Sequence, residues 1–134
     1  MVHLSVNWLA IVVATAASMI LGIAWYMGLS RQWMAAVGKT PEALQSAGPS
    51  PYLWSVLVQL VMAYFLAVMI APLTGEVSVI SGMAAGAQLW LGFVITAMIL
   101  NHRYQGAPWA LTLIDGGYML GVLVLQGAVI GAFG

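Results

Sequence analysis

The sequence contains no cysteine, which excludes disulfides, thiolate metal ligands and a thiol nucleophile. Charged side chains make up only 4% of its 134 residues. Soluble domains carry about 25%, so this chain cannot present an ordinary hydrated surface. Three basic residues balance three acidic ones, and no net positive field is left to attract nucleic acid. With 63% hydrophobic residues the chain is also too apolar to be disordered, which leaves an integral membrane protein.

The signatures of common catalytic and metal centres are missing as well. No Ser-His-Asp constellation, HExxH helix or phosphate-binding loop is recognisable. The two histidines, His3 and His102, are expected on opposite faces of the membrane, so one subunit cannot hold a metal or a haem between them. We therefore predict no catalytic, cofactor-binding or metal-binding residue and no nucleic-acid partner. The class of protein can be inferred from the sequence, but its biochemical activity cannot.

What the sequence has instead is four long apolar segments. Each is close to the 20 residues that a helix needs to cross a hydrocarbon core about 30 Å thick. Unpaired backbone groups are prohibitive in lipid, which favours helices over open strands. We expect an all-α fold, a polytopic membrane protein whose four transmembrane helices form a compact bundle. The single domain covers residues 1–134, with spans at about 8–28, 52–71, 77–101 and 109–133.

The connection between the first two spans, residues 29–51, is polar enough to lie outside the hydrocarbon. Ser30 is expected to cap a short helix that Gly38 ends, and Thr40 to cap another that starts with a proline. Trp33 favours an amphipathic loop lying on the membrane surface, and an ordinary solvated connector is the alternative. Pro72 is expected to end the second span.

Small residues recur at four-residue spacing in three of the expected helices, a pattern that lets helix backbones approach closely. These patterns are Ala10/Ala14/Ser18/Gly22, Gly82…Gly86, Gly117…Gly121 and Gly127…Gly131, and together they favour a compact bundle. The first two are each expected to face another helix, in the same subunit or in a neighbour.

The three basic residues indicate the orientation. Arg31, Lys39 and Arg103 all fall in the loops after the first and third spans, on one side of a four-span protein. The positive-inside rule then places residues 29–51 and 101–109 in the cytoplasm and both termini outside.

Asp115 is the one charged residue deep inside an expected span, roughly 10 Å from its start. Inserting such a charge costs roughly 2.5–3.5 kcal/mol, so it should face the bundle. We predict a polar layer of Asp115, Gln59 and Thr96, with Tyr118 within reach and Tyr26, His102 and Arg103 above it. Three roles remain open for the carboxyl group: a hydrogen bond to Gln59 that only pairs helices, a proton or cation site, or partial exposure to a water-filled crevice.

Two polar or aromatic side chains of the third span also need partners. Gln88, like Thr96, is predicted to be buried in the bundle. Trp90 lies near mid-membrane, where its indole N–H needs an acceptor or a crevice.

Short motifs at both ends of the chain resemble the domain-of-unknown-function 1761 family. They are Asn7-Trp8, Gly22 with Trp25-Tyr26, Trp33-Met34 with Gly38, Arg103-Tyr104-Gln105-Gly106, Leu113-Ile114-Asp115-Gly116-Gly117-Tyr118, and Gly127. The resemblance implies a small four-helix protein of the bacterial cytoplasmic (inner) membrane, without implying an activity. The family's tail motif reads Asn-Ala-Gly-Tyr-His, so Asp115, Gly116 and Met119 depart from it. An Asn at the first position implies that a carboxylate is not mandatory there.

Two function classes fit these observations. The first is a non-catalytic bundle that self-associates or serves as an accessory subunit of a larger membrane complex, with the lipid bilayer and other subunits as its partners. The second is a small oligomeric transporter or channel for protons or cations that uses Asp115. A membrane-bound glutathione-type enzyme is a weaker third, because three basic residues are few for holding an anionic substrate. A carboxylate that water can reach favours transport, and a dry, paired one favours the scaffold.

Overall fold

Four helices that are long and apolar enough to cross a membrane make up most of the computed structural model, which describes residues 6–46 and 48–134. They are α1 (Trp8–Gly28), α4 (Ser50–Thr74), the continuous run Val79–Gln105, and α7 (Trp109–Phe133). No strand occurs in the described residues. The prediction of an all-α membrane protein with four spanning helices is confirmed.

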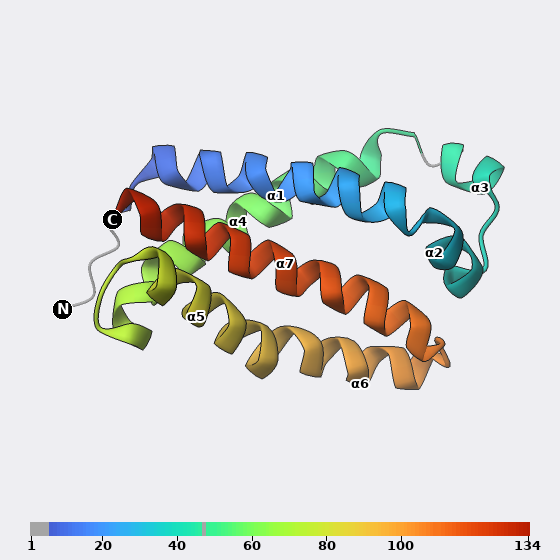
Figure 1. Ribbon diagram of the computed structural model, residues 1–134. Coiled ribbons are helices and arrows are strands. Elements are labelled where there is room, and N and C mark those ends of the chain that lie inside the picture. Colours follow the sequence, from blue (N-terminus) through green and yellow to red (C-terminus); the bar gives the residue numbers. More distant parts are fainter. Residues whose placement is uncertain (1–5, 47) are drawn as a thin grey trace.

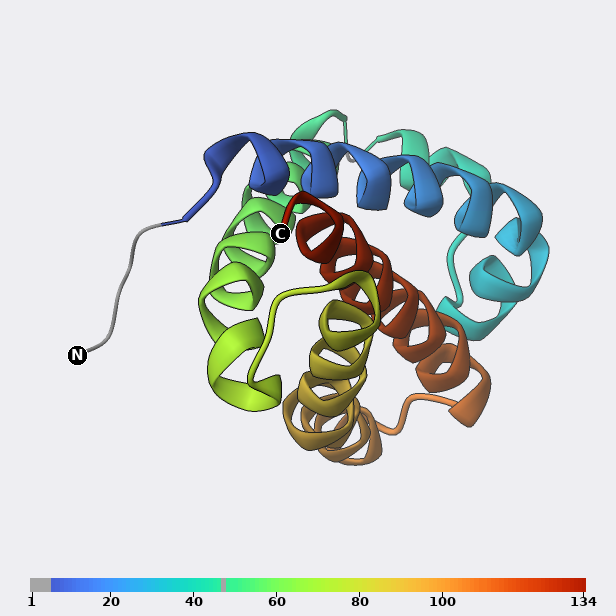
Figure 2. The ribbon, with the colours of Figure 1, turned by 60° about the vertical axis from the view of Figure 1, so that its left-hand side comes forward.

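Helix α7 occupies the middle of the bundle. Figure 1 shows it running between α1 and the helix pair α5 (Val79–Leu89) and α6 (Ile95–Gln105), and it also contacts α4. Figure 2, seen closer to the helix axes, shows α1, α4 and α5 around it. The short helices α2 (Ser30–Val37) and α3 (Pro41–Gln45) lie together at the opposite end from the C-terminus. The last span is therefore the core to which the other helices bind.

The contact between α5 and α7 is made by backbone rather than by side chains. A methyl group added at Gly82 would overlap the carbonyl of Gly127, and one added at Gly86 would overlap the carbonyl of Leu123. Gly131 is equally close to the carbonyl of Ser78. Both glycine motifs thus face a helix of the same subunit, as close approach through small residues requires.

The small-residue ridge of α1 also faces the interior. Ala10, Ala14 and Ser18 are fully buried, and the two alanines belong to the apolar core that α4 shares with α1. At the other end of the ridge, Gly22 lies against the Tyr118 ring of α7. The prediction that this ridge faces another helix is confirmed.

The other glycine pair of α7 faces α1. The missing side chains of Gly117 and Gly121 make room for Trp25 and Leu21, respectively. Helix α7 therefore has one glycine face for α1 and another for α5, which is how it fits between them.

The connection after α1 differs from the prediction at one cap. Ser30 was expected as N-cap of α2, but Leu29 occupies that position without a side-chain hydrogen bond. The helical hydrogen bonding continues across this junction, because the Leu29 amide bonds to the Trp25 carbonyl and the Leu29 carbonyl accepts from the Trp33 amide. Gly38 ends α2 in the left-handed conformation at φ 75°, and Thr40 caps α3 through Ala43 N–H, both as predicted.

The second span does not end at Pro72, contrary to the prediction. Helix α4 continues through that residue to Thr74 and ends at Gly75, where φ is +85°. Proline removes a single backbone donor, and in the last turn little of the helix remains to be disrupted. The Thr74 hydroxyl donates to the Ile70 carbonyl at 2.6 Å, one turn earlier in the same helix.

The third span begins later and ends later than expected, at Val79 and Gln105, and it is not a uniform α-helix. Ser78 and Ser81 form a capping box at its start. Between α5 and α6 lies η1 (Trp90–Val94), a π-helical segment in which the Ile95 amide bonds to the Trp90 carbonyl. Gly92 weakens the α-helical preference locally. In addition, the Trp90 indole donates to the Gly116 carbonyl of α7 at 2.8 Å.

The glycine contact predicts opposite effects for two equivalent substitutions. Gly82→Ala should destabilise the bundle by about 1–3 kcal/mol or more, because the methyl group overlaps the backbone of α7. Gly92→Ala should be neutral or slightly stabilising, since nothing lies within 4 Å of that position and alanine favours helices. Titration from mild detergent into SDS, followed by circular dichroism, measures both. Equal stability of the two variants would contradict the backbone contact.

Candidate functional site

A buried hydrogen-bonded network ties α7 to α1 and α4. The Ser18 hydroxyl donates to Gln59 Oε1 at 2.6 Å, and Gln59 Nε2 donates to the Tyr118 hydroxyl at 2.9 Å. The Tyr118 hydroxyl in turn donates to the Ser18 carbonyl at 3.1 Å. A second amide, Gln126, donates to Ser18 Oγ at 3.1 Å and to the Gln59 carbonyl at 3.0 Å. Buried polar groups need such partners, so this network fixes the register of the three helices.

Gln59 is fully engaged in this network. Its oxygen accepts from Ser18, and its nitrogen donates to Tyr118 and to Ser55 Oγ, the latter at 2.8 Å. The predicted hydrogen bond between Gln59 and Asp115 is therefore replaced by bonds to the two hydroxyl groups that lie closer. Tyr118, predicted to lie within reach of Asp115, instead accepts from Gln59. Its ring contacts that of Tyr26, the residue that binds Asp115.

Asp115 takes its hydrogen bond from α1 instead. The Tyr26 hydroxyl donates to Asp115 Oδ1 at 2.6 Å, and the carboxyl group is only partly buried. The Tyr26 ring is held edge-on between two others, with centroids 6.0 Å from Trp33 and 5.2 Å from Tyr118. Tyr26 is the only side-chain donor to Asp115 in the described residues, which leaves the rest of the carboxylate open to its surroundings.

Those surroundings are an open cavity of about 480 Å³, lined by residues from all four spans and α2. Aromatic rings, methionines and one carboxylate dominate its wall. The lining residues are Tyr26, Trp33, Trp54, Ser55, Val58, Gln59, Met98, Asp115, Tyr118 and Met119. Asp115 and Gln59 thus share one hollow although they are not bonded to each other, and no Lys or Arg lines it.

Two tryptophans hold the backbone of α7 on either side of Asp115. Trp25 of α1 donates to the Ile114 carbonyl at 3.0 Å, and Trp90 of η1 donates to the Gly116 carbonyl at 2.8 Å. The missing side chain of Gly117 makes room for the Trp25 indole, and that of Gly116 makes room for Ile95 and Met98 of α6. The indole N–H of Trp90 therefore has the hydrogen-bond acceptor that its predicted position near mid-membrane requires.

The third span contributes less to this site than predicted. Thr96 is exposed and donates to the Gly92 carbonyl of its own helix at 2.9 Å, and Gln88 is exposed too. The prediction that both are buried is wrong. Gly82 and Gly86 occupy the inner face of α5, so Gln88 falls on its outer face. Thr96 lies beyond the π segment Trp90–Val94, which rotates α6 relative to α5 and turns this residue outward.

His102 and Arg103 lie together at the end of α6, but they face Thr112 rather than Asp115. His102 Nδ1 lies 2.6 Å from Thr112 Oγ1, and Arg103 Nη2 donates to the same oxygen at 3.0 Å. The guanidinium also stacks on Trp109, with its Cζ 3.7 Å from the ring centroid. His3 lies outside the described residues. No group of three His, Asp or Glu side chains that could hold a metal comes together in the described part of the chain.

The residues that sequence reasoning missed are Gln126, the hydroxyl role of Ser18, and the cavity walls Trp33 and Trp54. One signal was available on α7. Asp115, Tyr118 and Gln126 are separated by three and eight residues, a helical stripe of polar groups on one face.

The motif around Asp115 and the aromatic residues of the cavity fall within residues 9–131, and this segment matches the family described as protein of unknown function (DUF1761). The chain belongs to this family. The resemblance seen in the short motifs is thereby confirmed over nearly the whole chain. No curated protein and no solved structure matches the chain. Because the family description names no activity, the functional argument depends on the geometry of the site.

The polar network predicts the effect of removing one hydroxyl group. Tyr118→Phe should lower the free energy of unfolding by about 1–3 kcal/mol, because Gln59 and the Ser18 carbonyl both lose a partner in a buried place. Tyr104→Phe, which removes a hydroxyl from a ring that is 87% exposed, should stay within about 0.5 kcal/mol. The same SDS titration measures both, and a Tyr118→Phe variant as stable as wild type would exclude a structural role for this hydroxyl.

Proposed function

We propose that this membrane protein binds a small organic cation in the cavity beside Asp115 and carries it across the bilayer. One observation carries the proposal: a partly exposed carboxylate and aromatic rings of Tyr26, Trp33 and Trp54 line the same cavity. This arrangement supports the transport hypothesis more than a role for Asp115 in helix pairing alone.

The chemistry of the wall favours a cation over other ligands. A carboxylate partly withdrawn from bulk water attracts positive charge more strongly than one in water, and the Tyr26 hydroxyl holds this carboxylate in place by hydrogen bonding. Faces of Tyr and Trp rings attract ammonium groups through their quadrupoles, most strongly where the site is dry. An anion would meet the carboxylate with no basic side chain on the wall to offset it. The volume of about 480 Å³ lies within the range of small-molecule sites, roughly 300–1,000 Å³.

Translocation rather than simple binding is supported by the polar face of α7. From Asp115 this face continues through Tyr118 to Gln126, which lies eleven residues further along, or roughly 16 Å. Gln126 Oε1 is buried without a hydrogen-bond partner in the described residues. This buried oxygen extends the polar face of α7 well beyond the cavity, towards the opposite end of the bundle.

The proposed orientation places the cavity near the cytoplasmic surface of a bacterial inner membrane, with the termini outside. The basic loops carrying Arg31 and Lys39 follow α1, at the end of the bundle where Trp33 and Trp54 line the cavity.

The absence of cysteine makes the orientation directly measurable. Lys39→Cys and Glu76→Cys place single thiols in loops at opposite ends of the bundle. In intact cells, a membrane-impermeant maleimide should label the residue-76 thiol and not the residue-39 thiol. Labelling in the reverse pattern would show the inverted topology.

Cation binding is tested with benzyltrimethylammonium and protein reconstituted in lipid nanodiscs, using calorimetry and tryptophan fluorescence. Asp115→Asn should weaken binding at least tenfold, since the amide keeps the Tyr26 hydrogen bond but loses the charge. Glu76→Gln removes a carboxylate outside the cavity and should bind like wild type.

A matched pair tests the aromatic wall. Trp54→Leu should weaken binding several-fold, whereas Trp8→Leu should not, although both rings are similarly exposed, at 63% and 58%. The cation site would be refuted if wild type and Asp115→Asn bound the cation with equal affinity and circular dichroism showed both proteins to be folded. Flux of the same cation into liposomes separates transport from binding, because a binding-only protein gives no flux above protein-free vesicles.

A second function, self-association, is favoured by a different observation. The Gln88 side chain is exposed about nine residues into the third span, near the middle of the bilayer. An amide facing hydrocarbon is costly, and Gln side chains hydrogen-bond across helices in membranes, at roughly 1–2 kcal/mol in model peptides. We propose that this face of α5 meets a second copy of the chain.

Gln88→Leu should therefore weaken dimerisation by about five- to thirtyfold, measured by energy transfer between labelled subunits as they are diluted in lipid. Gln105→Leu is the control, because that exposed glutamine ends α6 near the membrane surface. Monomeric wild-type protein at every dilution would exclude self-association, and equal loss in both variants would argue against the specific role of residue 88.

A further inference from the structure

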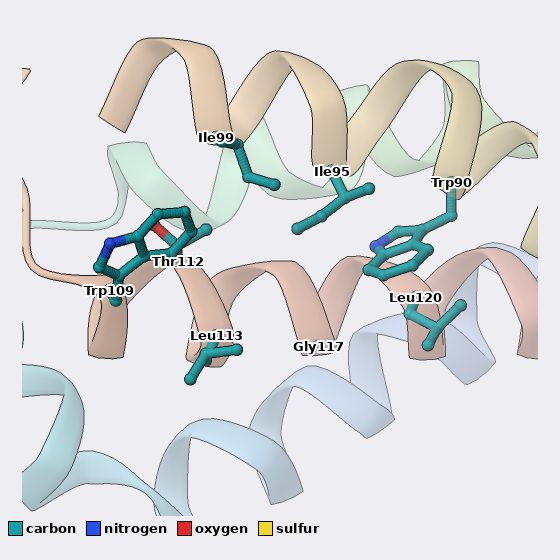
Figure 3. A pocket seen from close by; sticks show the side chains of 8 residues that line it. All are labelled: Trp90, Ile95, Ile99, Trp109, Thr112, Leu113, Gly117 and Leu120. Carbon is teal, nitrogen blue, oxygen red and sulfur yellow. The ribbon is translucent and has the colours of Figure 1, made fainter. Parts of the chain in front are cut away.

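A second hollow lies between α7 and the η1–α6 segment, and its lining is almost purely apolar. The crevice holds about 270 Å³. Figure 3 shows Ile95 and Ile99 on one side and Leu113 and Leu120 on the other, with Trp90 and Trp109 towards its two ends. Gly117 provides a floor without a side chain. The crevice extends along the axis of α7 and does not include Asp115.

One end of this crevice is positively charged. Thr112 and Trp109 belong to its lining, and Arg103 binds both, through a hydrogen bond to Thr112 and by stacking on the Trp109 ring. His102 contacts the same Thr112 hydroxyl. Arg103 as a whole is only half-buried, and in the described residues its one side-chain hydrogen bond runs from Nη2 to Thr112. The guanidinium thus retains donor capacity beside the mouth of an apolar slot.

The surrounding helix ends place this charge at headgroup level. Arg103 lies in the last turn of α6, and α7 begins at Trp109 without a side-chain cap. The first N–H groups of an uncapped helix attract anions, in addition to the two basic side chains. The crevice is apolar along its length and has basic side chains at one end. A molecule with a hydrocarbon chain and an anionic head matches both features.

We propose that the crevice seats one acyl chain of an anionic phospholipid, with its phosphate bound by Arg103 and His102. Basic pockets between transmembrane helices take anionic lipid headgroups in the same way. A peptide or a soluble anion would leave the apolar length of the slot unfilled. The site is distinct from the cation cavity, because it has its own lining residues and the opposite charge preference.

Native mass spectrometry of the full chain tests the proposal with dioleoyl phosphatidylglycerol and its zwitterionic phosphatidylcholine counterpart. The wild type should retain one phosphatidylglycerol in preference to phosphatidylcholine. Arg103→Gln should lower that occupancy about fivefold or more, whereas Arg31→Gln, in α2, should leave it unchanged.

A second pair of variants tests the hydrocarbon part. Ile99→Trp fills the crevice and should reduce lipid occupancy, while Leu100→Trp, at the neighbouring exposed position, should not. This pair decides the matter by itself if Arg103→Gln fails to fold. Equal retention of the two lipids, or Ile99→Trp binding as well as wild type, would overturn the proposal. Displacement of the lipid by millimolar inorganic phosphate would also overturn it, by showing a free-anion site.

Discussion

The bundle depends on the backbone contact between α5 and α7. Where Gly82 meets Gly127, two helices touch without intervening side chains, so α7 can lie in the centre with α1 and α4 still around it. Lipid offers little hydrophobic drive for helix association, which leaves close van der Waals contact and hydrogen bonds to hold the helices together. The Ser18–Gln59–Tyr118–Gln126 network supplies the second of these and fixes the register that the glycines allow.

This arrangement explains how a carboxylate is tolerated inside a span. Asp115 lies in the half of α7 that faces the loops between α1 and α4, where Tyr26 binds it and a cavity relieves its desolvation. Two indoles hold the neighbouring carbonyls, so the backbone that carries the carboxylate is fixed while its side chain faces open space. A rigid support beside an open cavity is the usual design of a binding site.

The spanning helices and their glycine faces were predictable because length, hydropathy and small-residue spacing are local properties of the chain. Helix ends were harder to predict. Pro72 indicates a helix end, but α4 continues through it because a proline in the last turn disrupts few hydrogen bonds. The site was predicted only in part. Asp115, Gln59 and Tyr118 do gather at one hollow, yet their partners depend on helix rotation, which residue spacing in one helix does not determine. Thr96 shows this most clearly, since the π segment before it turns it outward.

The π turn at Trp90–Val94 divides the third span into two mechanical units. A π turn contains about one residue more than an α turn, so reverting to α geometry would rotate the following helix by roughly 100°. Helix α5 would stay in place during such a rotation, because its glycine contact holds it against α7. Helix α6, with its basic end, could thus rotate about the π segment while α5 stays fixed. That rotation would carry Met98 out of one hollow and Ile99 out of the other in a single step, linking the occupancy of the two.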